Sequence, residues 1–247
     1  MRVGVPKEIK NNEFRVGMTP GAVREYVAHG HKVMVQTNAG AGIKAADADY
    51  KAAGATIAPD AATIFAENDM IVKVKEPQPS EYAQLRSGQI LYTYLHLAPD
   101  PEQTKGLLKS GVTGVAYETV TDDHGGLPLL APMSEVAGRL AIQAAAYALT
   151  APQGGRGLLM GGVPGVLPSK VLVIGGGVVG THSAKMAIGL GAEVTVLDRN
   201  LRRLSYLDDI FGGRVKTRYS TFEALDEETD AADVVVGAVL IPGASAP

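Results

Sequence analysis

The sequence predicts an α/β protein with two Rossmann-like domains and mainly parallel sheets, of which the second domain is incomplete at its C-terminus. Short apolar runs alternate with helical stretches of about ten residues, which is typical of parallel βαβ units. A glycine-rich turn joins one such run to a helical pattern in the second half of the chain. From that run onward the sequence offers about four strands, whereas a complete dinucleotide-binding fold has six.

Length and composition fit two domains with substantial cores. The chain has 247 residues, of which 46% are hydrophobic and only 5% aromatic, so small aliphatic side chains fill the cores. The net charge is −3 with dispersed Lys and Arg, which argues against a nucleic-acid partner. The absence of cysteine excludes disulfides, thiol catalysis and cysteine-ligated metals. Because no signal peptide or membrane helix is visible, we predict a cytoplasmic protein with no membrane partner and no metal site.

The first domain is predicted over residues 1–130, as six strands that alternate with helices. The strands are expected at Arg2–Val5, Lys32–Gln36, Ala55–Ile57, Met70–Val74, Gln89–Leu95 and Val112–Glu118. The helices are expected at Pro20–His29, Asp47–Ala53, Asp60–Glu67, Ser80–Leu85 and Pro101–Lys109. Thr19 precedes the first helix as its N-cap, with proline at the first helical position.

Residues 131–150 are predicted to form a helix that connects the two domains. Ser134 is expected to be its N-cap, and Glu135 lies in the first turn, where an acidic side chain is favourable. The stretch Ala137–Leu149 is rich in alanine, which suggests close packing against another helix. The glycine- and proline-rich stretch Pro152–Ser169 is expected to be a loop or hairpin, with apolar side chains suited to a subunit contact.

The second domain, residues 151–247, is organised around a glycine-rich turn. Val171–Ile174 is a short apolar run that suits a strand buried on both faces, and Gly175-Gly176-Gly177-Val178-Val179-Gly180 follows it. Gly175 permits a tight turn, Gly177 allows a pyrophosphate to approach the backbone, and Gly180 allows close packing of helix and strand. The N–H groups at the helix start would then face the phosphates. The helix is expected to bury Val178, Val179, Met186, Ala187 and Leu190.

An acidic residue completes this pattern. Val194–Leu197 reads as the next buried strand and ends at Asp198, whose carboxylate is expected to accept hydrogen bonds from the ribose hydroxyls. A carboxylate at this position would repel a 2′-phosphate, so the pattern favours NAD over NADP, a preference that Arg199, Arg202 and Arg203 weaken without reversing. A doubly wound turn that binds no nucleotide is the alternative. The remaining expected elements are a helix at Ser205–Phe211, a strand at Val215–Tyr219, a helix at Phe222–Glu228, a strand at Val234–Val239 and a loop at Leu240–Pro247.

Three chemically useful side chains follow strands of the first domain. Arg15 lies in the loop after the first strand, and Lys75 and His96 each come directly after a strand. Ligands of open parallel sheets bind at the carboxyl ends of strands, so these side chains are candidates for one crevice. Arg binds a carboxylate at two points, Lys polarises a keto or imino group, and His transfers protons. From spacing alone, solvated loop cations and a structural histidine remain alternatives.

Runs of residues along the whole chain resemble, in order, those of one known family. They are Gly4–Glu8, Asn12–Val16, Thr19–Pro20, Val72–Pro77, Tyr94–Leu97, Ala116–Thr119, Pro132–Arg139, Gly161–Val166 and Gly237–Ala244. The sequence is therefore similar to alanine dehydrogenases, a far more specific likeness than the glycine turn alone. The resemblance implies NAD-dependent, reversible oxidative deamination of L-alanine to pyruvate and ammonium by hydride transfer.

The resemblance also implies roles for individual residues. By position, Arg15 and Lys75 would hold the carboxylate and carbonyl of the substrate, and His96 would be the general acid/base for water attack on the imine. Together with the glycines of the turn, the residues expected to contact NAD are Ser134, Val178, Val179, Asp198, Arg203, Ser220, Val239 and Leu240. The family has a further catalytic aspartate, which would follow residue 247, and it forms homo-oligomers, often hexamers.

Two other interpretations of the sequence stay open. The nucleotide-binding portion of a proton-translocating NAD(P) transhydrogenase resembles this fold throughout but needs no amino-acid site. A truncated, non-catalytic NAD-binding protein is the second alternative. His96 within Tyr94–Leu97, and the intact run Lys75–Pro77, favour alanine dehydrogenase.

Overall fold

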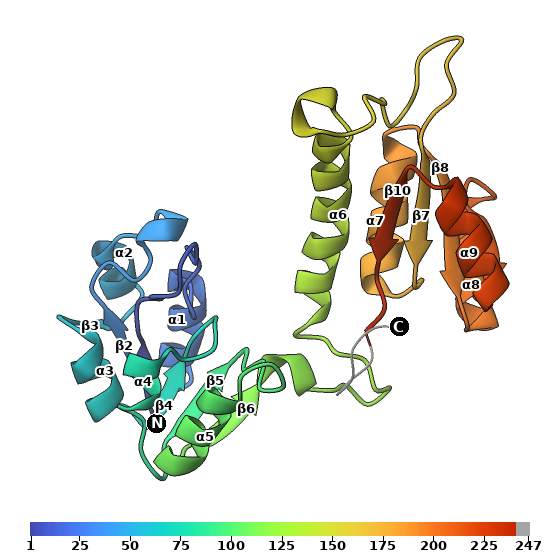
Figure 1. Cartoon of the computed structure of the whole chain (residues 1–247). Coiled ribbons are helices and arrows are strands. Elements are labelled where there is room, and N and C mark those ends of the chain that lie inside the picture. Colours follow the sequence, from blue (N-terminus) through green and yellow to red (C-terminus); the bar gives the residue numbers. More distant parts are fainter. Residues whose placement is uncertain (241–247) are drawn as a thin grey trace. The chain divides into compact units, whose positions relative to one another are not determined.

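The computed structural model describes residues 1–240, and the chain divides into two compact units, Met1–Leu127 and Pro128–Pro247. Each unit has its own parallel sheet and its own hydrophobic core (Figure 1). The predicted α/β fold with parallel sheets is therefore confirmed.

The first unit is built on six parallel strands within the described residues. They are β1 (Arg2–Val5), β2 (Lys32–Gln36), β3 (Thr56–Ala58), β4 (Met70–Val72), β5 (Ile90–Thr93) and β6 (Thr113–Ala116). Their order across the sheet is β3-β2-β1-β4-β5-β6. Because β2 lies on one side of β1 and β4 on the other, a topological switch point separates β1 from β4, and it is beside such points that ligands of open parallel sheets bind.

Helices cover both faces of the first sheet. They are α1 (Pro20–Ala28), α2 (Asp47–Ala52), α3 (Ala61–Glu67), α4 (Pro79–Tyr82) and α5 (Pro101–Ser110), with 3₁₀ turns at Ala41–Ile43 and Tyr117–Thr119. Val23 of α1 and Tyr50 of α2 pack with the valines of β1 and β2 in one buried cluster. Phe65 of α3 and Leu107 of α5 pack with Leu91 of β5 in another. The sheet is thus buried on both sides, as its apolar strands predicted.

Several strands of this sheet end earlier than the sequence suggested. β4 ends at Val72 instead of Val74, and β5 ends at Thr93 instead of Leu95. Two residues beyond each strand, the backbone donor binds a side chain: the N–H of Val74 donates to Glu8 Oε1 at 2.6 Å, and the N–H of Leu95 to Glu118 Oε1 at 3.0 Å. The N–H groups of Lys73 and Tyr94, which come directly after the strands, still donate to the backbone, so the carboxylates accept only the donors beyond them. The helix expected at Ser80–Leu85 is a single turn, α4.

The second unit contains four parallel strands among the described residues, in the order β10-β7-β8-β9. Its elements are α6 (Ala131–Ala148), a 3₁₀ turn at Ala151–Gln153, β7 (Lys170–Ile174), α7 (Val178–Gly189), β8 (Glu193–Asp198), α8 (Leu201–Phe211), β9 (Lys216–Tyr219), α9 (Phe222–Ala231) and β10 (Val234–Gly237). As in the first sheet, the first strand lies inside, so a switch point separates β7 from β10. The part of the predicted loop beyond Leu240, including Ile241–Ala244 of the last family-like run, lies outside the described residues.

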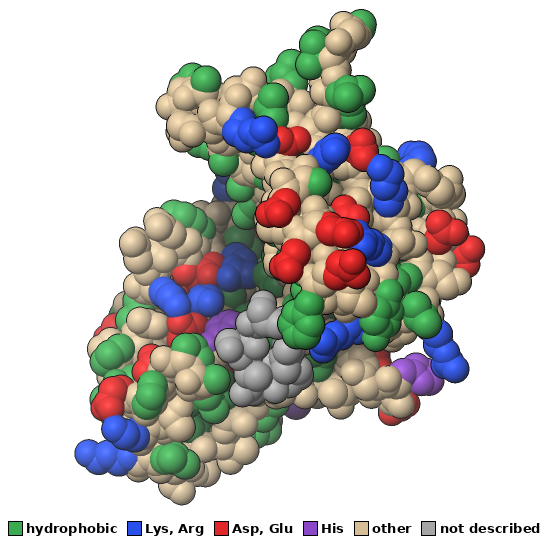
Figure 2. Space-filling view, turned by 45° about the vertical axis from the view of Figure 1, so that its right-hand side comes forward, with side chains coloured by type: hydrophobic (Ala, Val, Ile, Leu, Met, Phe, Trp, Pro, Cys, Tyr) green, Lys and Arg blue, Asp and Glu red, His purple; other side chains and the backbone are tan. Residues whose placement is uncertain are grey.

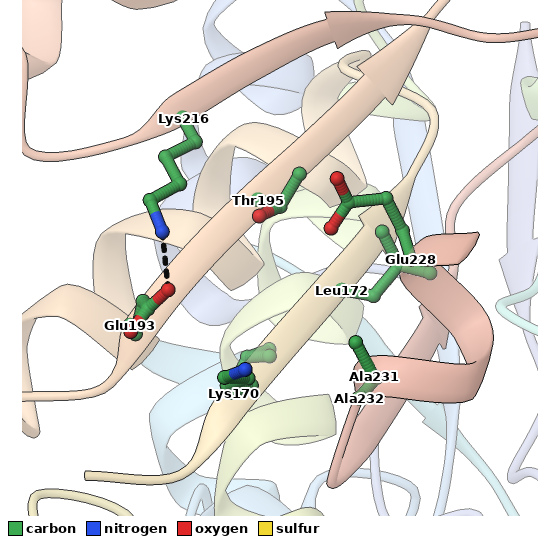
Figure 3. Close-up of a pocket in the computed structure, with 9 residues that line it drawn as sticks. Lys170, Leu172, Glu193, Thr195, Lys216, Glu228, Ala231 and Ala232 are labelled. Atoms are coloured by element: carbon green, nitrogen blue, oxygen red, sulfur yellow. Dashed lines mark hydrogen bonds and ion pairs between the residues drawn. The ribbon is translucent and has the colours of Figure 1, made fainter. Parts of the chain in front are cut away.

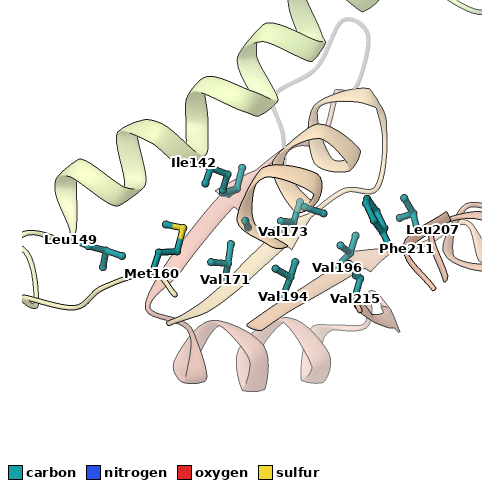
Figure 4. Packing of buried hydrophobic residues seen from close by; sticks show 13 residues of the cluster. Ile142, Leu149, Met160, Val171, Val173, Val194, Val196, Leu207, Phe211 and Val215 are labelled. Atoms are coloured by element: carbon teal, nitrogen blue, oxygen red, sulfur yellow. The ribbon is translucent and has the colours of Figure 1, made fainter. Parts of the chain in front are cut away.

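One face of the second sheet carries most of the core (Figure 4). Valines of β7 and β8 pack there against Ile142 of α6 and against Leu207 and Phe211 of α8. The opposite face buries a smaller cluster of Leu172, Leu197 and Ala224, with α9 above it. Half of the ten residues of α9 are acidic, and Figure 2 shows acidic side chains gathered on the face of this unit that is turned toward the viewer.

Two details of the second unit correct the sequence-based expectations. Ser134 is not an N-cap: α6 begins at Ala131, with proline in its first turn, and the N–H of Ser134 donates to Leu130 O at 3.1 Å. Of the residues expected to be buried by α7, Ala187 is buried, whereas Val178 and the C-cap residue Leu190 are exposed; the small residues Gly180, Ser183 and Ala184 are buried as well. Small side chains suffice because α6 lies close to α7: a Cβ at Gly138 would lie 2.9 Å from Cβ of His182. The predicted close packing of the alanine-rich helix is thereby explained.

Candidate functional site

The first group of candidate residues lies on the loops that diverge from β1 and β4. Arg15 is in the loop after β1, and Lys75 follows β4 by three residues. Arg15 binds Glu13 in a two-point ion pair, with Nε 2.9 Å from Oε1 and Nη2 2.6 Å from Oε2. Lys75 Nζ lies 3.3 Å from Oε2 of Glu76, which also pairs with Lys10. Both cations therefore stand beside acidic side chains of their own loops.

The electrostatics link these loops. Hydrogen bonds from Arg15 hold the pKa of the Glu13 carboxyl below its usual range, and the charge of Lys75 adds to this lowering. Burial acts to raise the pKa of Glu76, but the hydrogen bond from Lys10 and the charges of both lysines leave it lowered. Both carboxyls thus remain ionised well below neutral pH. A guanidinium and an ammonium are donors that suit a small anion such as a carboxylate.

His96 belongs to the same edge of the sheet and has an unusual backbone. It follows β5 with φ at 48°, in the left-handed region that side chains other than glycine rarely adopt. The carboxylate of Glu118 accepts the N–H of His96 at 2.7 Å and that of Leu95 at 3.0 Å, which stabilises this conformation. The exposed imidazole stacks on Tyr94, with ring centroids 6.1 Å apart at an angle of 18°. The backbone is thus constrained to present the ring at the edge.

The structure brings the three predicted residues together through two shared neighbours. Glu13 responds electrostatically to both Arg15 and Lys75. Tyr94 stacks on His96, and while burial raises the pKa of its hydroxyl, the charge of Arg15 acts in the opposite direction. Two cations, Arg15 and Lys75, and the imidazole of His96 therefore lie at the carboxyl edge of the first sheet.

Sequence reasoning missed the residues that hold these side chains. Glu13, Glu118 and Tyr94 contact the predicted site but were not proposed for it. A signal for Glu118 was present, since it comes two residues after β6 and the strand-end rule that selected Lys75 applies equally to acids. Glu13 could have been suggested by its position two residues before Arg15. The contact of Tyr94 requires the fold.

The glycine turn after β7 has the geometry that its sequence predicts. Gly175 has φ at 100°, and a Cβ there would lie 2.8 Å from Ala238 O. A Cβ at Gly180 would overlap the carbonyl oxygen of Gly175, so this glycine permits the contact between helix and strand. By contrast, no atom of the described residues lies within 4 Å of a Cβ built at Gly177. Gly175 and Gly180 are therefore packed against the protein, whereas the side of the turn at Gly177 is accessible to a ligand.

Gly177 is also the N-cap of α7 and has no side chain to cap the helix. The first N–H groups of an α-helix have no partner within the helix, and the helix dipole favours an anion at that end. The open face of Gly177 and Val178 therefore suits a phosphate group.

Asp198 and Arg203 both hold the peptide group of Gly176. The Oδ2 of Asp198 accepts the Gly176 N–H at 2.6 Å, and its Oδ1 accepts the Asn200 N–H at 2.8 Å. Arg203 Nε donates to Gly176 O, and its Nη2 donates to Thr181 Oγ1 at 2.6 Å. Each carboxylate oxygen of Asp198 retains a lone pair, so a further hydrogen bond from a ribose hydroxyl is compatible with these contacts.

The other predicted nucleotide contacts are distributed around this turn. Ser220 follows β9, and its N–H donates to Asp198 O at 3.0 Å. Val239 lies beside Gly175, and Leu240 is exposed. Val179 is in the first turn of α7. Ser134 lies on α6, which packs against α7: a Cβ at Gly138, one turn further along α6, would overlap the carbonyl oxygen of Val179.

The cavity in Figure 3 lies at the other edge of the second sheet. It has a volume of about 140 Å³ and is lined by residues at the amino ends of β7 and β8, Lys170 and Glu193, together with Lys216 and Glu228. Lys216 pairs with Glu193 across it. Because the glycine turn is at the carboxyl ends of these strands, this cavity is not part of the candidate nucleotide site. The described part of the chain contains no cluster of three or more metal-ligating side chains, and none of its helices is long and apolar enough to cross a membrane.

Comparison with known proteins assigns both halves of the chain to the same family. Residues 4–137 match the model of the alanine dehydrogenase/PNT N-terminal domain, and residues 141–247 match that of the C-terminal domain. The whole chain is 57% identical to alanine dehydrogenase of Halomonas elongata and 56% identical to that of Mycobacterium tuberculosis. The chain belongs to the alanine dehydrogenase family. The family predicted from the sequence is thus confirmed.

Solved structures agree with this assignment. An L-alanine dehydrogenase matches the whole chain with a TM-score of 0.92 at 53% identity. A transhydrogenase from Sinorhizobium meliloti also matches the whole chain, with a TM-score of 0.80 at 26% identity. The chain spans about two thirds of the length of these relatives: 67% of the H. elongata protein and 68% of the L-alanine dehydrogenase structure.

The left-handed backbone of His96 leads to a prediction about stability. A residue with a Cβ is strained at φ 48°, so we expect His96→Gly to be more stable toward urea unfolding than His96→Ala, by about 1 kcal/mol. Lys105, in the middle of α5, is the control: there the glycine variant should be less stable than the alanine variant by about 1 kcal/mol. If His96→Gly were also less stable than His96→Ala, as expected for the pair of variants at Lys105, the His96 backbone would not be strained.

Proposed function

We propose that this protein is an NAD-dependent L-alanine dehydrogenase, which interconverts L-alanine, NAD and water with pyruvate, ammonium, NADH and a proton. The observation that carries the proposal is the grouping of Arg15, Lys75 and His96 at the carboxyl edge of the first sheet. The family membership of the chain supports the same conclusion. In this proposal the first unit binds the substrate and the second unit binds the nucleotide.

The side chains of the first unit have the chemistry that a 2-oxo or 2-amino acid requires. The guanidinium of Arg15 has planar donors for the substrate carboxylate, and Lys75 would hold and polarise the carbonyl oxygen of pyruvate. Cations at these positions stabilise the negative charge that develops on oxygen. His96 would deprotonate the water that attacks the imine carbon, and return the proton during breakdown of the carbinolamine.

The second unit fits a dinucleotide by its geometry. The open surface at Gly177 and the free N–H groups at the start of α7 would receive the pyrophosphate. Asp198 has lone pairs for the ribose hydroxyls, and Val239 lies beside the turn, followed by the exposed Leu240. When bound, the nicotinamide ring would accept the hydride from the substrate Cα. The role of the protein in that step is to place Cα and to exclude other reactions.

Features of the surface support a homo-oligomer, which we propose to be a hexamer as in the family. Beyond α6 the chain forms a hairpin with an isolated bridge between Val163 and Val166. The exposed apolar side chains on α6 and around this hairpin are Val136, Leu140, Tyr147, Leu159, Val163, Val166 and Leu167. The cysteine-free composition is consistent with the cytoplasmic location that we propose.

The transhydrogenase alternative is weaker on these observations. The structural match to that protein is extensive but has 26% identity, against 52–57% for eight curated alanine dehydrogenases. A nucleotide-binding module would not need Arg15, Lys75 and His96 at the edge of the other sheet. A non-catalytic NAD-binding protein would leave the same residues without a role.

Steady-state assays of the full-length protein test the proposal. We expect NADH to form with L-alanine and NAD, and to be consumed with pyruvate and ammonium. Replacing Lys75 with Met should lower kcat/KM for pyruvate by about 100-fold or more, because a group that stabilises developing charge is lost. Lys105→Met, on the exposed side of α5, should leave it unchanged. Nucleotide binding without alanine-dependent turnover would favour either alternative over the dehydrogenase.

The position of Asp198 predicts the nucleotide preference. Replacing Asp198 with Ala or Gly removes the carboxylate that would repel a 2′-phosphate, so the ratio of kcat/KM for NAD to that for NADP should fall. Asp208→Ala, in the last part of α8, serves as the control for loss of an acidic side chain in the same unit. An unchanged ratio in the Asp198 variants would place the discriminating contact elsewhere.

A further inference from the structure

The loops that carry Arg15 and Lys75 are joined by a buried ion cluster. The Nζ of Lys73 lies 3.0 Å from Oε2 of Glu8 and 2.7 Å from Oε1 of Glu81. The side chain of Lys73 has no exposed surface, and those of the two acids are 2% and 3% exposed. Buried charges are costly unless they are paired and hydrogen-bonded, so the cluster fixes the relative positions of the segments that supply it.

Those segments belong to three parts of the first unit. Glu8 is in the loop after β1, Lys73 follows β4 directly, and Glu81 is in α4. The two carboxylates have matching contacts, since each accepts one bond from Lys73 and one from a backbone N–H. Glu8 Oε1 accepts the N–H of Val74 at 2.6 Å, whereas Glu81 Oε2 accepts that of Gln78 at 2.8 Å. Glu8 therefore binds the residue that precedes Lys75, and Glu81 binds the start of α4.

The segment Lys73–Lys75 is held by hydrogen bonds from several directions. The hydroxyl of Tyr117 donates to Lys73 O at 2.9 Å, and the hydroxyl of Thr93 donates to Lys75 O at 2.8 Å. The N–H of Tyr94 donates to Val74 O at 3.2 Å. These contacts come from the β5 and β6 side of the sheet. Glu8 supplies the buried contacts from the other side, the loop that also contains Arg15.

We propose that Glu8 is a positioning residue of the active site, which sets the place of Lys75 relative to the loop of Arg15. This inference rests on the proposed function, because it concerns the two side chains that would hold the substrate. Glu8 does not itself meet the substrate: its carboxylate oxygens are buried against Lys73 and Val74. A displacement of about 1 Å at a group that orients the substrate can lower the rate by about 100-fold.

Glu8→Gln and Glu81→Gln in the full-length protein form a matched pair of variants. Each removes one of the two negative charges around Lys73 and leaves the other, so Lys73 remains paired in both. Each also leaves an amide that can accept from only one of its two former donors. The variants differ in the segment that is loosened, which is the loop after β1 in the first and α4 in the second.

We expect Glu8→Gln to lower kcat/KM for pyruvate by about 10- to 100-fold while the KM for NADH stays unchanged, because the nucleotide site is in the other unit. Glu81→Gln should stay within about threefold of the wild-type protein in both constants. Equal losses in the two variants, or no loss in Glu8→Gln, overturn the role of Glu8. An absence of alanine-dependent turnover in the wild-type protein overturns instead the proposed function itself.

Amide hydrogen exchange gives a second readout that needs no catalysis. In Glu8→Gln, exchange should accelerate in peptides that contain Val74 and Lys75 and in peptides from the loop after β1. In Glu81→Gln, the acceleration should be confined to α4. The same exchange pattern in both variants would mean that the cluster supports the unit as a whole and does not place Lys75.

Discussion

In both sheets the strand order reverses direction beside the first strand, and the rest of the structure depends on this constraint. β1 lies between β2 and β4, and β7 lies between β8 and β10, so the following loops must leave in opposite directions. An opening at the carboxyl edge results in each sheet. The proposed substrate residues Arg15, Lys75 and His96 stand at one such edge, and the glycine turn stands at the other. The strand order alone thus provides two places where a ligand can bind, one at each sheet.

Carboxylates accept hydrogen bonds from the backbone of the loops at these edges. Where the strands end, backbone donors would lack partners, and in this chain acidic side chains accept them: Glu8 binds Val74, Glu118 binds His96, and Asp198 binds Gly176. An unpaired buried donor is costly, so each acid contributes to the stability of its loop. Two further acids, Glu13 and Glu76, pair with the cations Arg15 and Lys75. An arginine and a lysine can therefore stand near each other at the substrate edge without strong mutual repulsion.

The sequence predicted what depends on local patterns. Alternating apolar runs gave the order of elements, and the strand-end rule selected Lys75 and His96, because a residue after a parallel strand stands at the ligand-binding edge in any such sheet. The hydrogen bond from Val74 to Glu8 just beyond β4 was not predictable, since the two residues lie 66 positions apart in the chain. The prediction of Ser134 as the N-cap was wrong because capping preferences are weak, and the helix instead begins at Ala131, one residue before proline.

A crystal structure of the full-length protein with NAD and pyruvate would test the central claim most directly. We expect the pyruvate carboxylate on Arg15, its carbonyl oxygen between Lys75 and His96, the pyrophosphate against Gly177, and a ribose hydroxyl on Asp198. Pyruvate bound away from the edge of the first sheet, or a dinucleotide that avoids the glycine turn, would contradict it.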